Sequence, residues 1–386
     1  MNAEAHFPRE PDGRASDVIV IGAGIIGAGI ALRLAQAGLR VAVFDRGEPG
    51  GEASSAAAGM IAPQGEQLEP EAFSDLCWTS HSLYPQFVAE VEELSGAEVG
   101  YRRDGSLLVA LDDEQASELG EIAEAQAHRG FEVERLRLEA ARERVPGLGD
   151  GIREALFLPG DHWVDNERLT AAVIEAAGRL GVTFYSGEEV SRFQIHGHRV
   201  EGIEAAGRRF SAGEFVLAAG CWSGTLAASA EIELPTEPCR GQMLEFDGEL
   251  PIVVRAGHHY AVPRSGHRIL VGTTAEYAGF EKSVTAGGLA SVLEGVLRIL
   301  PSLKECRLRR TWAGLRPDTA DHLPILGLSA LDNLTVATGH FRNGILLAPV
   351  TARLIADVVL LTSSSPPVLE PFRAERFAFE ARAGRP

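Results

Sequence analysis

The order of apolar and polar residues predicts a βαβ unit near the beginning of the chain. Residues 18–21 form a continuous β-branched run of the kind that is buried in a parallel strand. Residues 25–37 continue with the pattern of a helix that ends at Gly38, and residues 40–45 return as a second strand. Strand, glycine-rich turn, helix and strand within about 30 residues make a βαβ unit, whose crossover is nearly always right-handed.

The rest of the chain alternates between helical and strand patterns, with one exception. Helices are expected over residues 73–94, 166–180 and 345–361, and short or buried strands over 106–110, 182–185, 200–205, 215–220 and 334–338. Asp165 is placed to cap the second of these helices. Between residues 241 and 272 four strand patterns follow one another with little helix between them, which is typical of an antiparallel sheet.

These patterns predict two domains of different class between two tails. A Rossmann-like α/β domain is expected in three pieces, over residues 17–90, 162–235 and 307–371. An α+β domain, mainly antiparallel, is inserted in two pieces, over residues 91–161 and 236–306. Residues 1–16 are polar and without periodicity, so they are expected to form a flexible tail, and residues 372–386 a C-terminal tail.

Composition and charge narrow the classes of function. The 386-residue chain carries a formal net charge of −18 at pH 7, which disfavours nucleic acid and an anionic membrane as partners. With 45% hydrophobic residues it can bury a core. The four cysteines contain no C-x-x-C pair, which favours free thiols in a reducing cytosol. His258 and His259 would point to opposite faces of a strand, so no metal is expected, and the protein is expected to be cytoplasmic.

A glycine-rich turn carries the first candidate for chemistry. Gly22, Gly24 and Gly27 match G-x-G-x-x-G after a strand and at the opening of a helix, and Asp45 ends the second strand. The first glycine makes the tight turn, the second admits backbone N–H groups to a pyrophosphate, and the third brings helix and sheet close together. Asp45 can accept hydrogen bonds from a ribose. The turn predicts a dinucleotide site without separating NAD from FAD.

Two further segments favour a flavin over a nicotinamide. Residues 50–60 offer backbone donors without bulky side chains, as the ribityl chain and ring edge of a flavin require. Residues 339–344 join a buried strand to a helix, so their N–H groups and the helix dipole can face the pyrimidine end of a flavin. In a nicotinamide dehydrogenase the second segment would have no purpose.

Six motifs recur together in one known family. They are residues 22–27, 54–60 (SSAAAGM), 240–242 (RGQ), 260–264 (YAVPR), 312–317 (WAGLRP) and 339–349 (GHFRNGILLAP). With these motifs the chain, from about residue 17 to 357, resembles the glycine oxidases of the thiamine-biosynthesis type, within the family of FAD-dependent D-amino-acid and sarcosine oxidases. The resemblance implies noncovalent FAD and oxidation of glycine or other small amines with O2. It also implies a fold like that of p-hydroxybenzoate hydroxylase, with an FAD-binding and a substrate domain, and a homo-oligomer.

The resemblance further implies the roles of individual residues. The substrate carboxylate is expected to bind Arg316 and Arg342, which suits the planar guanidinium group. Tyr260 is expected beside the substrate, and so is His258, two positions earlier on the same strand face. The expected FAD contacts are Gly22, Gly24, Ile25, Ile26, Gly27, Asp45, Arg46, Ala53, Ser54, Ser55, Ala58, Gly59, Met60, Val190, Gly220, His340, Phe341, Arg342, Asn343, Gly344, Ile345 and Leu346.

Two departures from the family pattern bear on cofactor and substrate. Asp45 stands where the family usually has Glu, so the carboxylate can still accept from ribose hydroxyls but reaches less far. Ala275 stands where a bulky Met is expected, which predicts a wider site that takes more than glycine. Residues 318–320 read Asp-Thr-Ala and lack the Cys that covalent flavin attachment requires.

The reaction expected from this resemblance is hydride transfer from Cα of a neutral amine to flavin N5. Molecular oxygen would then reoxidise the flavin to give H2O2, and water would hydrolyse the imine to an oxo acid and ammonia. Two alternatives stay open. One is an amine or D-amino-acid dehydrogenase that passes electrons to a quinone or another acceptor. The other is a flavin-binding redox module without turnover.

Overall fold

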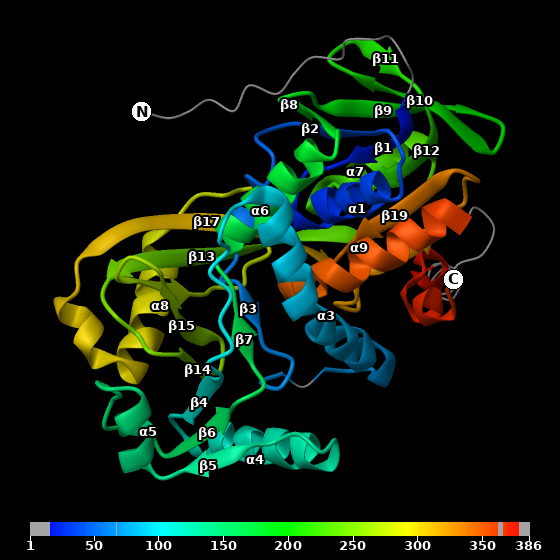
Figure 1. Cartoon of the computed structure of the whole chain (residues 1–386). Coiled ribbons are helices and arrows are strands. Elements are labelled where there is room, and N and C mark those ends of the chain that lie inside the picture. The colour runs from blue at the N-terminus through cyan, green and yellow to red at the C-terminus, as the bar shows by residue number, and fades with distance from the viewer. Residues whose placement is uncertain (1–15, 67, 362–365, 378–386) are drawn as a thin grey trace, which may run out of the picture.

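The structure is a computed structural model that describes residues 16–66, 68–361 and 366–377. Figure 1 shows an upper body, in which helices lie against the first strands of the chain, and a lower body around a larger sheet. The long strands β13 (Thr236–Asp247) and β17 (Leu308–Thr319) pair with each other along their length. The predicted tail over residues 1–16 lies, except for Ser16, outside the described residues.

The upper body contains a six-stranded sheet that confirms the predicted βαβ unit. Its order is β18-β19-β12-β1-β2-β8, in which neighbours from β19 to β8 are parallel and β18 is antiparallel to β19. The strands are β1 (Ser16–Ile21), β2 (Val41–Asp45), β8 (Thr183–Ser186), β12 (Ala212–Leu217), β18 (Ile325–Leu328) and β19 (Leu334–Thr338). The β-branched and aromatic residues of β1, β2, β12 and β19 are buried on both faces, as parallel strands require, whereas Thr183 and Tyr185 of the edge strand β8 are half-buried.

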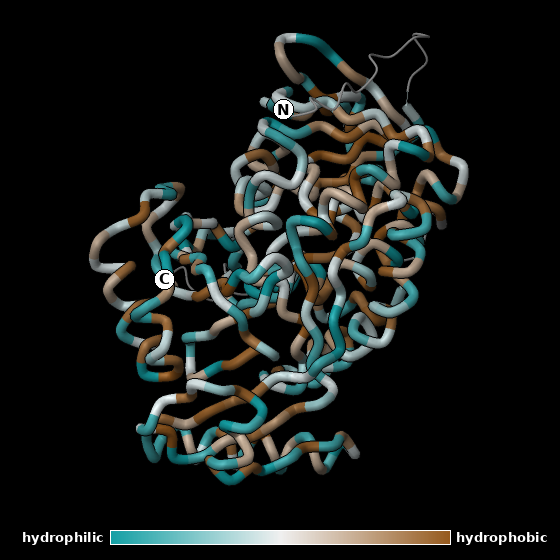
Figure 2. Tube along the Cα trace, turned by 60° about the vertical axis from the view of Figure 1, so that its left-hand side comes forward, coloured by the Kyte–Doolittle hydropathy of each residue, from teal (hydrophilic) through white to brown (hydrophobic). Residues whose placement is uncertain are grey.

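Four helices cover one face of this sheet, and a small antiparallel sheet with one helix covers the other. The four helices are α1 (Ile25–Gln36), α3 (Glu71–Ser95), α6 (Asn166–Arg179) and α9 (Gly344–Leu361). The opposite face packs against β9 (Val190–His196), β10 (Arg199–Ala205), β11 (Arg208–Phe210) and α7 (Ser223–Ala227). Figure 2 shows the resulting layer of hydrophobic strands inside the upper body. Asp165 caps α6 as predicted, because its side chain accepts from the N–H of Arg168 at 3.2 Å.

One apolar helix among the described residues is long enough to span a bilayer. It covers Phe341–Leu360, and 67% of its most apolar stretch is buried inside the protein. It includes α9, which packs against α1 and α3. Its apolar sequence is therefore accounted for by the core that it fills.

The lower body is built on an eight-stranded sheet with the order β17-β13-β16-β15-β14-β4-β6-β5. Its remaining strands are β4 (Ser106–Ala110), β5 (Glu134–Leu136), β6 (Glu154–Leu158), β14 (Val253–Ala256), β15 (His259–Arg264) and β16 (Arg268–Gly272). The antiparallel sheet predicted over residues 241–272 is confirmed, and β14 is also parallel to β4. Strand β17, which lies in the predicted piece 307–371 of the α/β domain, belongs to this larger sheet. The domain boundaries stay a prediction.

Helices α4 (Asp113–His128), α5 (Leu138–Arg144) and α8 (Ala286–Ile299) cover this sheet. The sequence does not predict α8, because its glycines weaken the helical pattern. The structure shows what they are for. A Cβ would lie 2.1 Å from the Gln242 side chain at Gly288 and 2.1 Å from the His259 ring at Gly295. Glycine therefore lets α8 approach the sheet closely.

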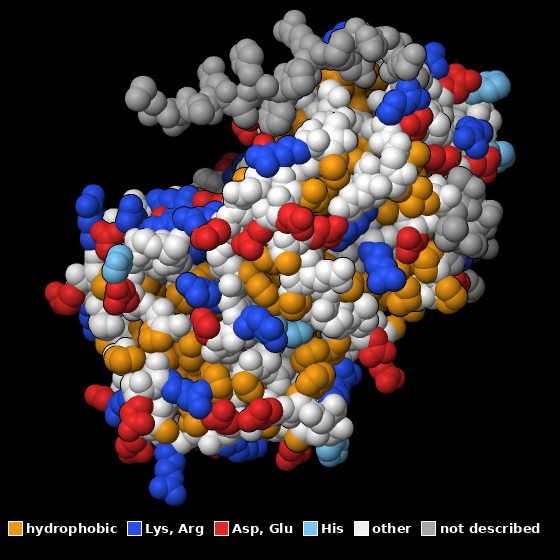
Figure 3. Space-filling view, in the orientation of Figure 1, with side chains coloured by type: hydrophobic (Ala, Val, Ile, Leu, Met, Phe, Trp, Pro, Cys, Tyr) orange, Lys and Arg blue, Asp and Glu red, His pale blue; other side chains and the backbone are white. Residues whose placement is uncertain are grey.

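Short elements make the remaining connections. They are α2 (Ala53–Ala56), β3 (Met60–Ile61), β7 (His162–Trp163), which pairs with β3, and the 3₁₀ turns η1 (Gly220–Trp222), η2 (Ala228–Ala230), η3 (Pro301–Glu305), η4 (Phe341–Asn343), η5 (Pro367–Phe372) and η6 (Ala374–Phe377). Phe372, at the start of the predicted C-terminal tail, is buried in the core beside Phe73. Figure 3 shows basic and acidic side chains interspersed over the face in view, so neither sign dominates that face.

Candidate active site

Residues of both large sheets line one cavity of about 810 Å³. Nearly all the site residues expected from the sequence line it, including Arg316, Arg342, Tyr260 and His258. Three of the expected residues are not among those that line it, namely Gly27, Ser55 and Leu346. Leu346 is instead buried in the core of the upper body. The fold thus brings together segments that lie far apart in the sequence.

The glycine-rich turn at one end of this cavity is held by close backbone contacts. Gly22 has a φ of +103°, and a Cβ there would lie 2.3 Å from the carbonyl oxygen of Ala218. A Cβ on Gly27 would lie 1.9 Å from the carbonyl oxygen of Gly22. The first and third glycines of the motif are therefore required by space. Gly24 and Ile25 line the cavity, so the first turn of α1 faces it.

Asp45 ends β2 beside this turn and lines the cavity. Its Oδ2 accepts from the N–H of Ala23 at 2.7 Å, and its Oδ1 accepts from the N–H of Gly47 at 2.9 Å. Burial raises the pKa of the carboxyl group, whereas the two hydrogen bonds act in the opposite direction. Because each carboxylate oxygen can accept more than one hydrogen bond, the group can also bind a ligand hydroxyl.

The small-residue segment between β2 and β3 is anchored by buried side chains. Ser54 Oγ accepts from the N–H of Ile25 at 2.9 Å, at the N-terminus of α1. Asn166 Nδ2 donates to the carbonyl oxygen of Ser54 at 2.8 Å, and Arg264 Nη2 donates to that of Ala58 at 2.7 Å. The sequence alone does not predict that Asn166 and Arg264 anchor this segment. Their partners are 112 and 206 positions away, so no local pattern reveals the contacts.

Five residues, which we call the clasp, meet near the end of β2, and three of them, Arg46, Glu52 and Trp222, line the cavity. The guanidinium of Arg46 lies 3.6 Å from the ring centroid of Trp222, and Phe280 stacks on the same ring with 5.5 Å between centroids. Lys282 Nζ lies 2.9 Å from a carboxylate oxygen of Glu52. Phe280 and Lys282 belong to the connection between β16 and α8. The clasp therefore ties the lower body to the upper body at this end of the cavity.

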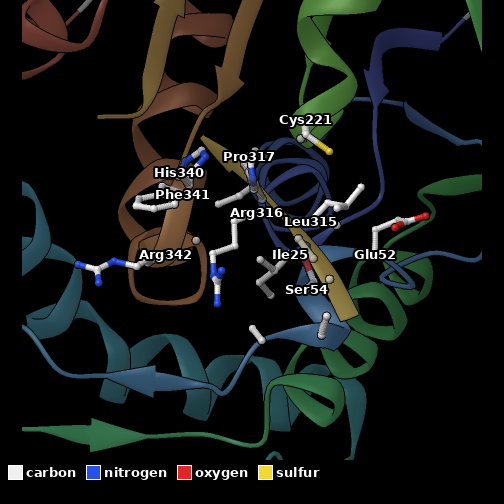
Figure 4. Close-up of a pocket in the computed structure, with 18 of the residues that line it drawn as sticks. Ile25, Glu52, Ser54, Cys221, Leu315, Arg316, Pro317, His340, Phe341 and Arg342 are labelled. Carbon is white, nitrogen blue, oxygen red and sulfur yellow. The ribbon is translucent and has the colours of Figure 1, made fainter. Parts of the chain in front are cut away.

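Arg316 projects from β17 into the cavity (Figure 4). Its Nη2 donates to Thr273 Oγ1 at 2.8 Å, and its Nη1 donates to the carbonyl oxygen of Thr274 at 3.2 Å. A Cβ on Gly241, in the paired strand β13, would lie 2.3 Å from Nη2, so this glycine makes room for the guanidinium group. Arg316 forms no ion pair with a described residue, and its charge is available to a ligand.

Arg342 also lines the cavity, but its guanidinium group is bound by Glu66. Arg342 Nη2 lies 3.1 Å from one carboxylate oxygen of Glu66, and Arg255 Nη2 lies 3.1 Å from the other. Figure 4 shows that the side chains of Arg316 and Arg342 point in different directions. The sequence predicts that both arginines bind one substrate carboxylate. For this to happen, Arg342 has to break its ion pair with Glu66. Glu66 and Arg255 were not predicted, because neither stands in a recognisable motif.

The two remaining candidates for the substrate site, Tyr260 and His258, lie in different surroundings. Tyr260 is buried on β15, and its hydroxyl donates to the Sδ of Met243 at 3.3 Å. His258 is exposed and lies in the turn before β15, which begins at His259. The argument that His258 shares a strand face with Tyr260 is therefore wrong, because the alternation of faces applies only within a strand. Both residues nevertheless line the cavity.

The loop between β19 and α9 contributes a buried histidine and a strained aromatic residue. His340 Nε2 lies 3.1 Å from Thr351 Oγ1, and burial lowers the pKa of the imidazole to about 3. His340 is therefore neutral at pH 7. Phe341 has a φ of +45° and stacks on His322 with 4.9 Å between ring centroids. This loop is held in one conformation beside Arg342.

The described residues that line the cavity offer neither a reactive thiolate at Cys221 nor a cluster that could hold a metal ion. Cys221 lines the cavity, and burial raises the pKa of its thiol to about 12, so it stays protonated near neutral pH. No cluster of three or more His, Cys, Asp or Glu side chains among the described residues could hold a metal ion.

Comparisons with known proteins agree with this geometry. Residues 17–358 match the family described as FAD dependent oxidoreductase. The chain is 37% identical to a bifunctional protein ThiO/ThiG of Trichormus variabilis, over 95% of this chain and 56% of the relative. It is 34% identical to a glycine oxidase of Geobacillus kaustophilus, over 89% of this chain and 92% of the relative. The chain therefore spans about half the length of the bifunctional relative.

Two solved structures share the fold over nearly the whole chain. The crystal structure of a glycine oxidase from Geobacillus kaustophilus has a TM-score of 0.89 at 33% identity and covers 94% of this chain and 99% of its own. That of an iminodiacetate oxidase from Chelativorans sp. has a TM-score of 0.84 at 30% identity and covers 92% of this chain and 98% of its own.

Proposed function

Because the chain belongs to the FAD-dependent oxidoreductase family, we propose that it oxidises glycine and other small amines or amino acids. One observation supports this most directly. The cavity is lined by the first turn of α1 and Asp45, and it is also lined by Arg316, whose guanidinium has no acid partner among the described residues. A site of this kind suits a dinucleotide cofactor next to a small molecule that carries one carboxylate.

The residues present fit FAD. Gly22 and Gly27 sit where a Cβ would clash with backbone, so they set the tight turn and the close packing of α1, and Gly24 would let the pyrophosphate approach the first turn of α1. Asp45 would accept from the ribose, and the small residues of segment 53–60 would face the rest of the cofactor. Gly27, Ser55 and Leu346 do not line the cavity, so the contacts expected of them with FAD stay a prediction. We propose noncovalent binding, because residues 318–320 offer no Cys.

FAD, when bound, supplies the acceptor for the hydride that leaves Cα of the amine, and we propose O2 as the final oxidant. The residues of the chain bind and orient the substrate. The fork of Arg316 matches a carboxylate in bidentate fashion. Tyr260 would border the substrate, and Gly272 leaves room for its ring, because a Cβ there would lie 2.7 Å from the hydroxyl. His340 is a poor base at neutral pH, because its pKa is about 3. We propose that the amine reacts from its neutral form and that no side-chain base is required.

The finer organisation is also a proposal. The predicted pieces 17–90, 162–235 and 307–371 would form the FAD-binding domain, and 91–161 with 236–306 the substrate domain, in a layout like that of p-hydroxybenzoate hydroxylase. A cytoplasmic homo-oligomer is expected from the resemblance to glycine oxidases. The similarity to a protein named ThiO/ThiG supports a role in thiamine biosynthesis.

The test is anaerobic mixing of the purified yellow protein with glycine, sarcosine and D-alanine while the visible flavin absorbance is followed. Bleaching by a small amine, followed by recovery and H2O2 formation on admission of air, is the expected result. Bleaching without H2O2 would favour a dehydrogenase that uses a quinone or another acceptor. A yellow protein that no small amine bleaches would favour a flavin-binding module without turnover.

A further inference from the structure

An ion triad of Arg342, Glu66 and Arg255 forms part of the cavity wall. Each carboxylate oxygen of Glu66 lies 3.1 Å from one guanidinium group. The Glu66 and Arg255 side chains are only 16% and 12% exposed, whereas Arg342 is 47% exposed. Nη1 of Arg255 is buried and has no hydrogen-bond partner. Arg255 therefore keeps an unused donor inside the protein, where its charge also acts on the buried carboxyl group of Asp161.

Glu66 occupies the place that an acid group of a ligand would take. Two guanidinium groups on either side of one carboxylate make a site for an anion, and the chain fills this site with its own side chain. Arg316, by contrast, forms no ion pair with a described residue. A ligand with one carboxylate can bind Arg316 without disturbing the triad. Because Arg316 and the triad line the same cavity, a ligand with two carboxylates that binds Arg316 and reaches the triad with its second charge meets Glu66, where like charges repel.

We propose that Glu66 is a specificity-determining residue, which reserves Arg255 and Arg342 and thereby selects amines with one carboxylate over amines with two. The proposal rests on the proposed function, since it assumes that the substrate carboxylate binds Arg316. Arg255 contributes to this selection, because its ion pair with the other oxygen of Glu66 helps to hold the carboxylate in the cavity wall. Removing the charge of Glu66 should open both arginines to a second acid group.

The kinetic test compares Glu66→Gln with the parent protein on three substrates. These are glycine, iminodiacetate, which is glycine with a second carboxymethyl group, and the monoamide of iminodiacetate, which has the same size and one charge fewer. The ratio of kcat/KM for iminodiacetate to that for glycine should rise at least tenfold in Glu66→Gln, through KM rather than kcat. The ratio of kcat/KM for the monoamide to that for glycine should differ between the two proteins by no more than about twofold. The reason is that Glu66→Gln removes a charge repulsion and hardly changes the size of the site.

Glu90→Gln is the matched control. Glu90 pairs with Arg33 on the outside of the upper body and does not line the cavity, so the same change of charge should leave all three ratios unaltered. Glu66→Asp is a second test variant, because the shorter side chain cannot reach both guanidinium groups. Its ratio of kcat/KM for iminodiacetate to that for glycine should lie between those of the parent protein and Glu66→Gln. An unchanged ratio in both Glu66 variants, or an equal rise for iminodiacetate and its monoamide, would overturn the proposal.

A binding experiment separates failure of this proposal from failure of the proposed function. Glutarate has the chain length of iminodiacetate but no amine, and butyrate is its one-carboxylate counterpart. Titration of the bound-flavin spectrum should show that the parent protein prefers butyrate and that Glu66→Gln gains affinity for glutarate at least tenfold. If this switch occurs in a protein that oxidises no amine, the specificity proposal stands and the oxidase proposal fails. Equal selectivity in both proteins, or no binding of either acid, overturns the specificity proposal.

Discussion

The two ends of the cavity are built in different ways. At the end where β2 stops, the glycine turn and Asp45 come from one βαβ unit of the sequence, and close backbone contacts decide the geometry. At the other end, Arg255, Arg316 and Arg342 come from β14, β17 and the turn before α9. Ion pairs with Glu66 orient Arg255 and Arg342, and hydrogen bonds to Thr273 and Thr274 orient Arg316. The first end is fixed by local chain geometry. The second depends on the folding of the whole chain, so its selectivity can change with single side chains.

The largest effect is expected from Gly27→Ala, which tests whether the first end depends on space alone. The added Cβ would lie 1.9 Å from the carbonyl oxygen of Gly22, and backbone has to move to admit it. The variant should lose FAD, measured as the visible absorbance of the purified protein, and it should unfold at lower temperature. Gly178→Ala, where a Cβ meets nothing within 4 Å, should retain both properties. A yellow and fully stable Gly27→Ala protein would contradict this account.

Arg316→Lys should have the next largest effect and tests the second end. Lysine keeps the charge but loses the bidentate fork, at a cost of about 2 kcal/mol, or roughly 30-fold in kcat/KM for glycine. The loss should appear mainly in KM, while FAD affinity stays unchanged. Arg309→Lys on the same strand is the control, because Arg309 pairs with Asp247 outside the cavity. A KM for glycine that does not move would remove Arg316 from the substrate site.

A smaller effect is expected from the buried His340, and it should appear in how the free energy of unfolding depends on pH. Its pKa is about 3 in the folded protein, below the 6.5 of an unfolded chain, so the unfolded chain binds the proton first as the pH falls. The stability that the neutral ring contributes is fully present above pH 6.5 and is lost as the pH falls toward 3, by up to about 1.4 kcal/mol per pH unit. Urea unfolding at pH 7 and pH 5 should therefore show a smaller difference for His340→Gln than for the parent.

The exposed His198→Gln serves as the control for that experiment and should keep the pH dependence of the parent protein. If His340→Gln lost as much stability between pH 7 and pH 5 as the parent does, the buried ring would not be a source of acid sensitivity.

The smallest effect is expected from Lys282→Gln in the clasp. Its ion pair with Glu52 is partly exposed, so removing it should cost only a few tenths of a kcal/mol and raise the dissociation constant of FAD about threefold or less. Fluorescence of FAD released on dilution measures this constant. The effect should vanish at high salt, because salt screens exposed pairs. Lys304→Gln, on the turn η3, should leave the constant unchanged.

The contrast between the two ends also explains what could be predicted from the sequence. The βαβ unit, α6 with its cap at Asp165, the strands between residues 241 and 272 and the cavity-lining role of most of the glycine-rich segments follow from local patterns and family motifs. Helix α8 could not be predicted because its glycines, which allow close packing, weaken the helical pattern. The roles of four other residues could not be predicted because their partners are distant in the sequence, namely Asn166, Arg264, Glu66 and Arg255. The position of His258 in a turn was missed because the alternation of strand faces was extended to a residue that precedes the strand.

The paired strands β13 and β17 have a mechanical consequence. Each is twelve residues long, they stay in register from Thr236 opposite Thr319 to Leu244 opposite Thr311, and they contact η1 of the upper body while forming the edge of the lower sheet. The two paired strands thus connect the upper body to the lower body. A hinge that swings the bodies apart would have to break this connection, so substrate has to enter and product has to leave through small displacements of loops and side chains, and both bodies should melt in a single calorimetric transition.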